Sequence, residues 1–225
     1  MLVKEGRVSL NGRIVRDIDA PTLEKDEIVI NGQKIEVSDK IYFMMNKPRG
    51  VVTTANDEKG RTTVMELFRE QYAKMFPGKS LPHISPVGRL DAASEGLLLF
   101  SNDTEWANSI LEPKPDSDTH QKIYRVQTKG KPTAEQLHQM ELGMTVPPRV
   151  FGEPEEFMQA KSAKLFSEGE KNCWLEIILT EGKNREIRRM LAHLGYEVLR
   201  LVRIQIDDFT LGDLKSGDIR EIKPD

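Results

Sequence analysis

The feature that most restricts the fold is a short apolar run near the middle of the 225-residue sequence. Gly96-Leu97-Leu98-Leu99-Phe100 contains no polar position, which is typical of a strand in the centre of a sheet. Further patterns indicate strands over residues 41–45, 123–128 and 174–179, and helices over 64–68 and 133–142. Strands and helices that do not alternate regularly predict an α+β fold, with a largely antiparallel or mixed central sheet flanked by helices.

The first 40 residues indicate a separate small β module. Asn11-Gly12 lies between two short alternating apolar segments, which predicts a hairpin with a two-residue turn. A second strand pair is predicted around Asn31-Gly32. Ser38-Asp39-Lys40 is a short polar junction, so we expect one domain over residues 1–38 and a second over residues 39–225.

Composition excludes several classes of protein. Lys and Arg number 33 against 36 Asp and Glu, and no window approaches the ~18 consecutive apolar residues that a membrane span needs. Lys4 and Glu5 lie where a signal peptide would need an apolar stretch. The single cysteine, Cys173, excludes a disulfide framework and a multi-cysteine zinc site. We therefore expect a cytoplasmic protein that does not contact membranes.

Motifs for metals and cofactors are missing from the sequence. The four histidines have neither metal-ligand spacing nor a set of cysteine partners. Pro77-Gly78-Lys79-Ser80 resembles the end of a phosphate-binding loop, but Ala73 stands where that motif needs a glycine. The sequence therefore gives no support for a metal, a dinucleotide or another cofactor.

Positive charge is unevenly distributed in this slightly acidic chain. Residues 1–16 carry four Lys or Arg against one acid, and residues 182–203 carry six against two. Each segment alone is more often a solvated face of a protein than a binding site. Two such segments together indicate an anionic ligand.

Asp91 is the main candidate for chemistry. It follows Arg89 in Gly88-Arg89-Leu90-Asp91, on a loop that leads into the predicted central strand. A charged group at the rim of a core is held rigidly, although this segment taken alone favours a structural ion pair or a turn carboxylate. A single carboxylate without a metal suggests a nucleophile or a general base.

A second candidate is the basic segment that contains a predicted helix. Ile187, Met190, Leu191 and Leu194 have the spacing of a buried helical face, whereas Arg185, Arg188 and Arg189 share the opposite face. The arginines either cover an ordinary surface helix or bind phosphates and a nearby carboxylate. The pattern alone does not choose between the two.

Tyr124 lies in the strand predicted at residues 123–128. A lone tyrosine on a strand most often packs in a core or an interface. The functional alternative is a platform on which a nucleobase stacks.

These segments together resemble one known enzyme family. The matching motifs are Asn46-Lys47-Pro48-Arg49-Gly50, Gly88-Arg89-Leu90-Asp91 with Gly96-Leu97-Leu98-Leu99, Lys122-x-Tyr124-x-Val126, Glu181 to Met190, and Leu201-x-Arg203 with Gly217-x-x-Arg220. They occur in the same order, over residues 41–222, in the RsuA/RluB/RluE/RluF family of ribosomal RNA pseudouridine synthases. The resemblance implies an isomerase with the pseudouridine synthase fold, which converts a specific uridine of ribosomal RNA, with the large subunit slightly favoured.

The resemblance also implies roles for particular residues. Asp91 would be the catalytic aspartate, and Tyr124 would stack on the target base. Arg188 would pair with Asp91 and keep it ionised. Arg89 would lie beside the flipped nucleotide, and Ile187 would form part of the apolar wall of the pocket.

Further implications of the resemblance concern binding and partners. Arg185 and Lys47 would hold phosphates, and the family chemistry needs no cofactor and no metal. The partner would be ribosomal RNA or a ribosomal assembly particle, and the protein would be a monomer. RNA affinity should fall steeply with salt because of Arg185, Arg189 and the basic residues of segment 1–16.

Residues 2–37 resemble the later part of an S-four-type RNA-binding module. Leu2 to Gly12 matches the end of its second helix and the following hairpin. This resemblance implies a module that is either truncated before Met1 or degenerate.

Two other functions fit parts of the same pattern. The first is a non-catalytic RNA-binding or ribosome-assembly factor on the same fold, against which the intact Asp91, Tyr124 and Arg188 count. The second is a hydrolase of nucleosides or sugars, which would need a second acid facing Asp91.

Overall fold

A computed structural model describes residues 2–23, 25–35, 39–54, 57–112, 120–148, 150 and 152–224. The chain divides into two compact units, Met1–Asp39 and Lys40–Asp225. This division lies one residue from the boundary expected between residues 38 and 39, and Ser38 itself is outside the described residues. In the part of the chain that is described, no helix is long and apolar enough to cross a membrane.

The first unit is a small antiparallel sheet. Its strands are β1 (Val8–Leu10), β2 (Arg13–Val15), β3 (Ile28–Ile30) and β4 (Gln33–Lys34), in the order β2-β1-β3-β4. Asn11 and Gly12 have φ angles of 49° and 78°, and Asn31 and Gly32 have φ angles of 52° and 80°. Positive φ at both turn positions is what a two-residue hairpin turn requires, so both predicted Asn-Gly hairpins are confirmed.

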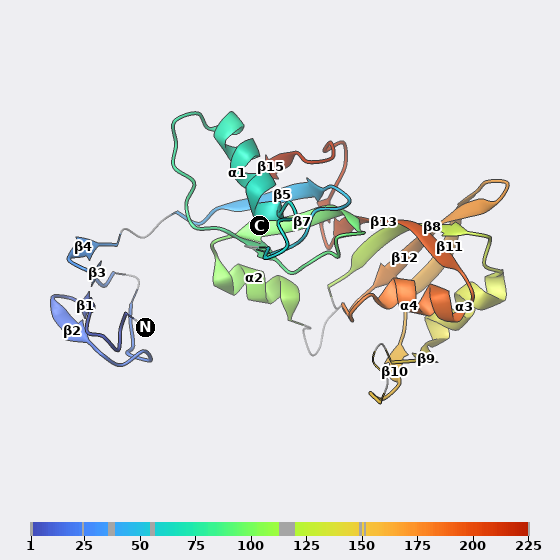
Figure 1. Cartoon of the computed structure of the whole chain (residues 1–225), viewed down its shortest axis with the longest axis horizontal. Coiled ribbons are helices and arrows are strands. Elements are labelled where there is room, and N and C mark those ends of the chain that lie inside the picture. The colour runs from blue at the N-terminus through green and yellow to red at the C-terminus, as the bar shows by residue number, and fades with distance from the viewer. Residues whose placement is uncertain are drawn as a thin grey trace. The chain divides into compact units, whose positions relative to one another are not determined.

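The second unit is built on a nine-stranded mixed sheet in the described residues (Figure 1). Its main path runs β11-β12-β8-β13-β7-β5-β15, with β14 on β13 and β6 on β7. The strands are β5 (Tyr42–Lys47), β6 (Ser85–Val87), β7 (Glu95–Ser101), β8 (Lys122–Lys129), β11 (Ser162–Glu168), β12 (Asn172–Leu179), β13 (Glu197–Ile206), β14 (Phe209–Thr210) and β15 (Ile219–Glu221). A separate antiparallel pair is formed by β9 (Met144–Val146) and β10 (Glu156–Met158). The α+β prediction with a mostly antiparallel sheet is confirmed.

Four helices accompany the sheet in the described residues. They are α1 (Val64–Met75), α2 (Thr104–Leu111), α3 (Ala134–Leu142) and α4 (Glu186–His193). α1 begins with a capping box, in which Thr63 Oγ1 accepts from the backbone N–H of Glu66 and the Glu66 carboxylate accepts from the backbone N–H of Thr63. The structure therefore confirms helices at each of the predicted positions.

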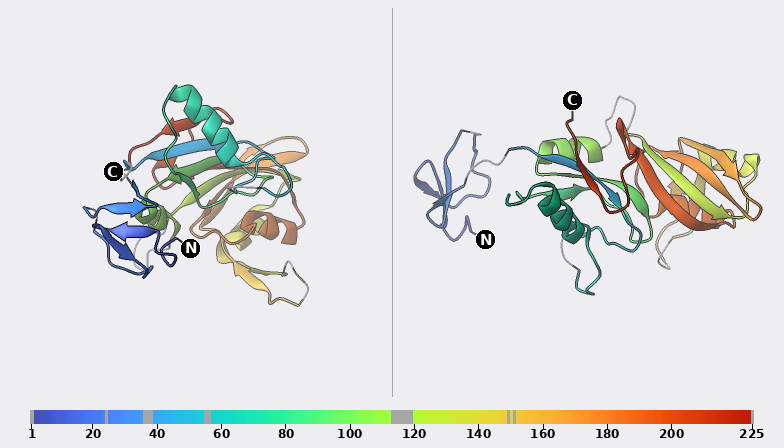
Figure 2. Two further views of the ribbon diagram at one scale, coloured as in Figure 1. Left: turned by 60° about the vertical axis from the view of Figure 1, so that its left-hand side comes forward. Right: turned by 90° about the horizontal axis from the view of Figure 1, so that it is seen from above.

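The apolar run is buried because both faces of β7 are covered. Leu98 and Phe100 pack in one cluster with Phe68 of α1, whereas Leu97 and Leu99 pack in another with Ile110 of α2. Figure 2 shows α1 and α2 on opposite sides of β7 and β5. A strand covered on both faces has no position for a polar side chain, which explains the continuous run.

One parallel contact joins the two halves of this sheet. β13 pairs with β7 at Val202↔Glu95 and Arg203↔Gly96, whereas the other pairs between named strands in the described residues are antiparallel. A Cβ on Gly96 would lie 2.2 Å from the backbone oxygen of Arg203, and Gly96 has a φ of 103°. Only glycine allows the two strands to approach so closely.

Candidate active site

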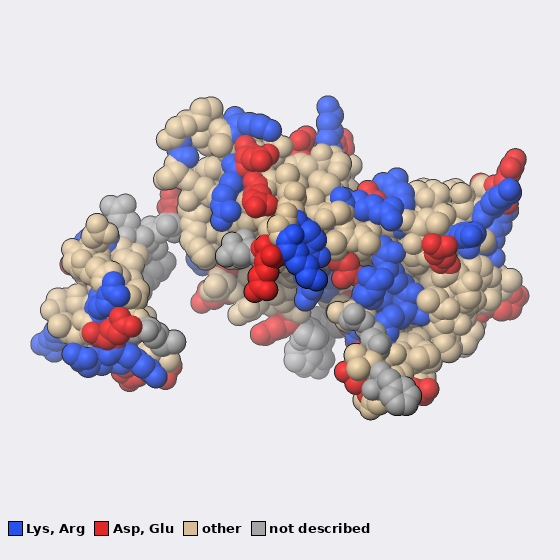
Figure 3. All heavy atoms as spheres, in the orientation of Figure 1, with Lys and Arg blue, Asp and Glu red and all other residues tan. Residues whose placement is uncertain are grey.

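A cleft of about 380 Å³ lies beside this parallel contact. Most of its lining comes from the loop before β7, the start of β8, the segment that leads from β12 into α4, and β13, and the end of α2 and His120 complete it. The lining includes Arg89, Asp91, Lys122, Tyr124, Arg185, Glu186, Ile187, Arg188 and Arg203. Lys and Arg side chains gather on the surface over α4 and the neighbouring strands (Figure 3).

Asp91 lies on a loop that its backbone contacts hold tightly. Thr53 Oγ1 donates to the carbonyl of Leu90 at 2.8 Å and accepts from the N–H of Leu90 at 3.3 Å. The N–H of Ser94 donates to the carbonyl of Asp91 at 3.0 Å, and the N–H of Gly50 donates to the carbonyl of Ala92 at 2.7 Å. The loop therefore presents the Asp91 carboxylate from a fixed backbone, with 28% of the side chain exposed to the cleft.

Arg185 is the ion-pair partner of Asp91. Its Nη1 lies 3.3 Å from Asp91 Oδ2, and its side chain remains 40% exposed. Arg185 precedes the first turn of α4 with a φ of 53°, a left-handed conformation that is uncommon for a residue with a side chain. Strained backbone of this kind is often kept where it positions a functional group.

The prediction that Arg188 pairs directly with Asp91 is wrong in this structure. Arg188 Nη2 donates to the carbonyl of Ala93 at 3.0 Å, and its Nη1 donates to the carbonyl of Val198 at 3.2 Å. Burial lowers the pKa of this guanidinium, and the charge of Asp91 opposes that shift. Arg188 therefore fastens the loop of Asp91 to β13, because the backbone carbonyls are within its reach and the carboxylate is taken by Arg185.

Lys47 also differs from its expected phosphate-binding role. It is the last residue of β5 and is fully buried, and its Nζ donates to the carbonyls of Ser94 at 2.8 Å and Pro48 at 3.0 Å. Burial lowers the pKa of this ammonium to about 8, although Glu95 and Asp91 act in the opposite direction. The ammonium supports the loop from inside the protein and has no surface to offer a phosphate.

Tyr124 and Ile187 form apolar surface in the cleft. Tyr124 is 7% exposed on β8, and Ile187 is 3% exposed in the first turn of α4. Both belong to the main hydrophobic core and both line the cleft. Tyr124 therefore packs in the core and also presents part of its side chain to the cleft. Arg89 lies at the same cleft as an exposed side chain.

The sequence analysis named three polar residues of this cleft only as parts of matching motifs and assigned them no role at the site. Glu186 and Arg203 are 3% and 4% exposed, and Lys122 lines the same cleft. Lys122 could have been found because it lies two residues before Tyr124 on one strand, so that both face the same way. No local pattern predicts a buried Glu186 or Arg203, since charged residues are rarely buried.

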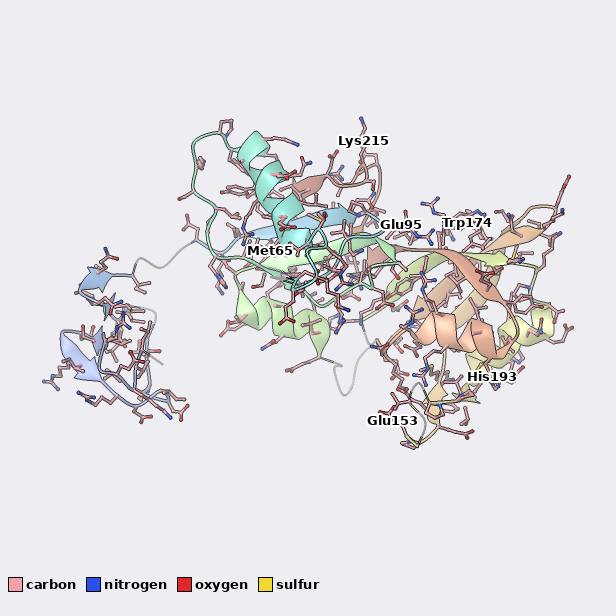
Figure 4. All side chains as sticks on the ribbon, in the orientation of Figure 1. Met65, Glu95, Glu153, Trp174, His193 and Lys215 are labelled. Atoms are coloured by element: carbon pink, nitrogen blue, oxygen red, sulfur yellow. The ribbon has the colours of Figure 1, made fainter. Side chains whose placement is uncertain are left out.

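Metal ligands do not cluster in the described residues. No group of three His, Cys, Asp or Glu side chains in them is arranged to hold a metal ion. Glu95, the acid nearest to Asp91 in the motif, lies where β7 meets β13 (Figure 4), and both of its oxygens accept from Arg200 at 3.0 and 2.8 Å.

Known proteins resemble this chain in sequence and in fold. Residues 41–193 match a family model described as RNA pseudouridylate synthase. The chain is 37% identical over 226 residues to "Ribosomal large subunit pseudouridine synthase B" of Bacillus subtilis (strain 168), which covers 99% of this chain and 84% of that one. It is 32% identical over 200 residues to "Ribosomal large subunit pseudouridine synthase E" of Vibrio parahaemolyticus, which covers 86% of this chain and 78% of that one.

A solved structure agrees with these relatives. The structure titled "Crystal structure of pseudouridylate synthase" superimposes with a TM-score of 0.66 at 26% identity, over 99% of this chain and 87% of that chain. The family match covers the loop of Asp91, the strand of Tyr124 and all of α4, which together supply most of the cleft lining. The chain therefore belongs to the RNA pseudouridine synthases, in the RsuA/RluB/RluE group of that family.

Proposed function

We propose that this protein isomerises one uridine of ribosomal RNA to pseudouridine, with Asp91 as the catalytic residue and the large-subunit RNA as the substrate. The observation that carries the proposal is the Asp91 carboxylate, presented from a rigid loop and paired with Arg185 at 3.3 Å at the edge of a cleft. The large-subunit assignment is supported by the names of the relatives from Bacillus subtilis and Vibrio parahaemolyticus.

The reaction breaks the bond between N1 of uracil and C1′ of ribose, turns the base, and joins C5 to C1′. Nothing is oxidised and no atom is gained overall, because the hydrogen that leaves C5 is balanced by the one that N1 gains. Asp91 would either attack C1′ or remove the 2′ proton. In both cases the carboxylate needs a fixed position beside the ribose, which the hydrogen bonds around Leu90 and Ala92 would provide.

The base would enter the cleft after leaving its stack in the RNA. Flipping a nucleotide costs a few kcal/mol, and the cost is lowest for a base in a loop. Tyr124 would stack against the uracil, Ile187 would cover it, and Arg89 would lie beside the nucleotide. Arg188 would act as a positioning residue, since its guanidinium contacts the backbone of the Asp91 loop.

The surrounding cations would hold the RNA backbone. Arg185 is half exposed at the edge of the cleft, whereas Arg189 already pairs with Glu156 and donates to the carbonyl of Pro147 at 3.0 Å. We therefore expect Arg185→Gln to reduce the salt dependence of RNA binding by a slope of about one, and Arg189→Gln to change it less. An affinity that does not change with salt would contradict this part of the proposal.

The first unit would assist as a partial S-four-type RNA-binding module. Lys4, Arg7, Arg13 and Arg16 lie in or beside its first hairpin. We place the reaction in the cytoplasm, on free ribosomal RNA or on an assembling ribosomal particle, with the protein acting as a monomer.

The test compares ribosomal RNA from cells with and without this protein. Pseudouridines are mapped by carbodiimide adducts that stop reverse transcription. We expect one site in the large-subunit RNA to disappear on deletion, to return with the wild type, and to stay absent with Asp91→Asn. Asp213→Asn is the matched control, because Asp213 pairs with Arg220 on the surface with 91% of its side chain exposed.

The same experiment addresses the non-catalytic alternative. If no site in ribosomal or transfer RNA changes on deletion, the protein is an RNA-binding factor and the Asp91–Arg185 pair is structural. If the site returns with Asp91→Asn, the proposed catalytic residue is wrong.

A further inference from the structure

Four polar side chains that line the cleft each have one buried hydrogen-bonding atom without a partner in the part of the chain that is described. They are Glu186 Oε1 and Arg203 Nη2, on residues that are 3% and 4% exposed, together with His120 Nε2 and Arg188 Nε. Leaving a buried polar group unsatisfied costs about 1–3 kcal/mol, and more for a charged group. Four such groups lining one cleft indicate a polar ligand, and Glu186 and Arg203 lie next to Ile187 and Tyr124, between which the base would lie.

These groups surround the side chains between which the base would lie. Lys122 lies two residues before Tyr124 on β8, and Arg203 is the cross-strand partner of Tyr124 on β13, so the three side chains share one face of the sheet. Glu186 immediately precedes Ile187 at the start of α4. The polar set therefore occupies the same part of the cleft as the two apolar walls.

Burial and neighbouring charges shift the pKa values of Lys122 and Glu186. Burial lowers the pKa of Lys122, and the nearby Arg203 lowers it further, whereas Asp207 and Glu186 raise it. Burial and the neighbouring Glu181 raise the pKa of Glu186 to about 7. Glu186 Oε2 accepts from the N–H of Lys183 at 3.1 Å, so Oε1 is the oxygen that remains for a ligand.

We propose that Lys122 and Glu186 recognise the Watson–Crick edge of the target uracil. The Lys122 ammonium donates to a uracil carbonyl, and Glu186 Oε1 pairs with N3–H, while Arg203 Nη2 supplies a further donor on the same sheet face. Uracil presents acceptor, donor and acceptor along this edge. Cytosine has the same shape but carries an acceptor at N3 and a donor at C4. The Glu186 acceptor would then face another acceptor, and the Lys122 donor would face another donor if it contacts this end of the edge.

The expected position of the ribose supports this orientation. Asp91 must face the ribose in either form of the reaction, because the bond that breaks is at C1′. A base stacked on Tyr124 then directs its far edge away from Asp91, into the cleft that Lys122 and Glu186 line. This inference rests on the proposed uridine isomerase function and adds to it the residues that select uracil.

The test measures the affinity of three short RNAs by fluorescence anisotropy. They contain the mapped target position as uridine, as cytidine or as an abasic ribose, and the protein carries Asp91→Asn so that no turnover occurs. We expect the uridine RNA to bind 10–100-fold more tightly than the other two. Adding Glu186→Met should lower the affinity for the uridine RNA to within a few-fold of the affinity for the cytidine RNA. Lys122→Met, tested in a separate protein, should have the same effect.

The abasic RNA separates base recognition from a structural role. Its affinity should not change in either variant, because it lacks the edge that the two residues contact. Glu186→Gln keeps one acceptor oxygen and replaces the other with an amide donor, so it should lower the affinity for the uridine RNA and leave that for the abasic RNA unchanged. Lys164→Met and Glu176→Gln are matched controls on strands of the same sheet and should leave all three affinities unchanged.

The outcomes distinguish this inference from the proposed function. If the wild type forms pseudouridine and both the Glu186→Met and Lys122→Met proteins still prefer uridine 10-fold or more over cytidine, the inference is wrong and the function stands. A loss of affinity for the abasic RNA equal to that for the uridine RNA would also overturn it. If the wild type modifies no RNA, the proposed function fails before this test applies.

Discussion

The two halves of the large sheet differ in how they are covered. The half with β5 and β7 is packed on both faces, and Leu97 to Phe100 are all fully buried. The half with β8 and β12 is packed on one face by α3 and α4, and its residues alternate between buried and partly exposed. The Asp91 loop belongs to the first half and Tyr124 to the second, so the cleft combines a rigid support for the carboxylate with a surface on which polar side chains can face a ligand.

The face of β8, β11 and β12 that is turned away from α3 and α4 carries aromatic side chains and paired charges. Trp174 on β12 is partly exposed (Figure 4), and the Arg125 guanidinium lies 3.5 Å from the centre of the Phe166 ring. Arg125 also pairs with Glu176. The charges on this face are therefore largely paired with each other, whereas those in the cleft keep atoms available for a ligand.

The largest effect is expected where the two halves meet. Gly96→Ala would place a methyl group 2.2 Å from the backbone oxygen of Arg203 at a φ of 103°. We expect a loss of about 4 kcal/mol in the free energy of unfolding, from overpacking and backbone strain together. Urea denaturation measures it, with Gly212→Ala as control, because Gly212 has a φ of 54° but nothing within 4 Å of its added Cβ. Equal losses in the two variants would show that the close contact between β7 and β13 is not required.

Truncating one leucine in each half of the sheet tests whether the half packed on both faces contributes more to stability than the half packed on one face. Leu98 in β7 is fully buried, whereas Leu165 in β11 is 44% exposed. Leu98→Ala should lower the free energy of unfolding by about 3 kcal/mol because it leaves a cavity, and Leu165→Ala by less than about 1 kcal/mol. Similar values from denaturant titrations would mean that the second half is as tightly packed as the first.

Glu186, at the start of α4, should make the free energy of unfolding depend on pH. Its pKa is about 7 in the folded protein against an ordinary value of 4.5, so the folded state holds a proton that the unfolded state has lost between these values. Its contribution to stability is therefore present at low pH and lost as pH rises toward 7. The Glu186→Gln protein should gain up to about 2 kcal/mol relative to the wild type between pH 5 and pH 7.5. A stability difference that stays constant with pH would contradict a buried, protonated carboxyl.

The smallest effect is expected on the outer face. Glu176→Gln removes the ion pair with Arg125, whose side chains are 34% and 24% exposed respectively. Pairs that water can reach contribute little, so we expect a change below about 1 kcal/mol in urea denaturation and none in RNA modification. A loss of modification in this variant would show that the outer face takes part in RNA binding.

Local patterns predicted the parts of this molecule in which neighbours in sequence decide the structure. The two Asn-Gly turns, the continuous run of β7 and the buried face of α4 each follow from residues within one segment. The motif around Asp91 also placed a carboxylate next to the central strand, as the structure has it.

Contacts between distant segments could not be predicted in the same way. The turn motif at Lys47 suggested an accessible lysine, but alternation along β5 directs that residue inward with Met45. The choice of Arg185 over Arg188 as the partner of Asp91 depends on a left-handed residue before α4 and on the carbonyls of Ala93 and Val198. Such geometry involves segments about a hundred residues apart, so spacing within one helix cannot reveal it.

The parallel contact between β7 and β13 has a consequence for the synthesis of the chain. The paired residues Glu95 and Val202 are separated by more than a hundred positions, and β15 pairs with β5, the first strand of its unit. A nascent chain can pair β5 with β7 early, whereas β13 begins about a hundred residues after β7. Because β13 pairs with both β7 and β8, the cleft between the carboxylate loop and the tyrosine strand can form only after this later strand has joined the two.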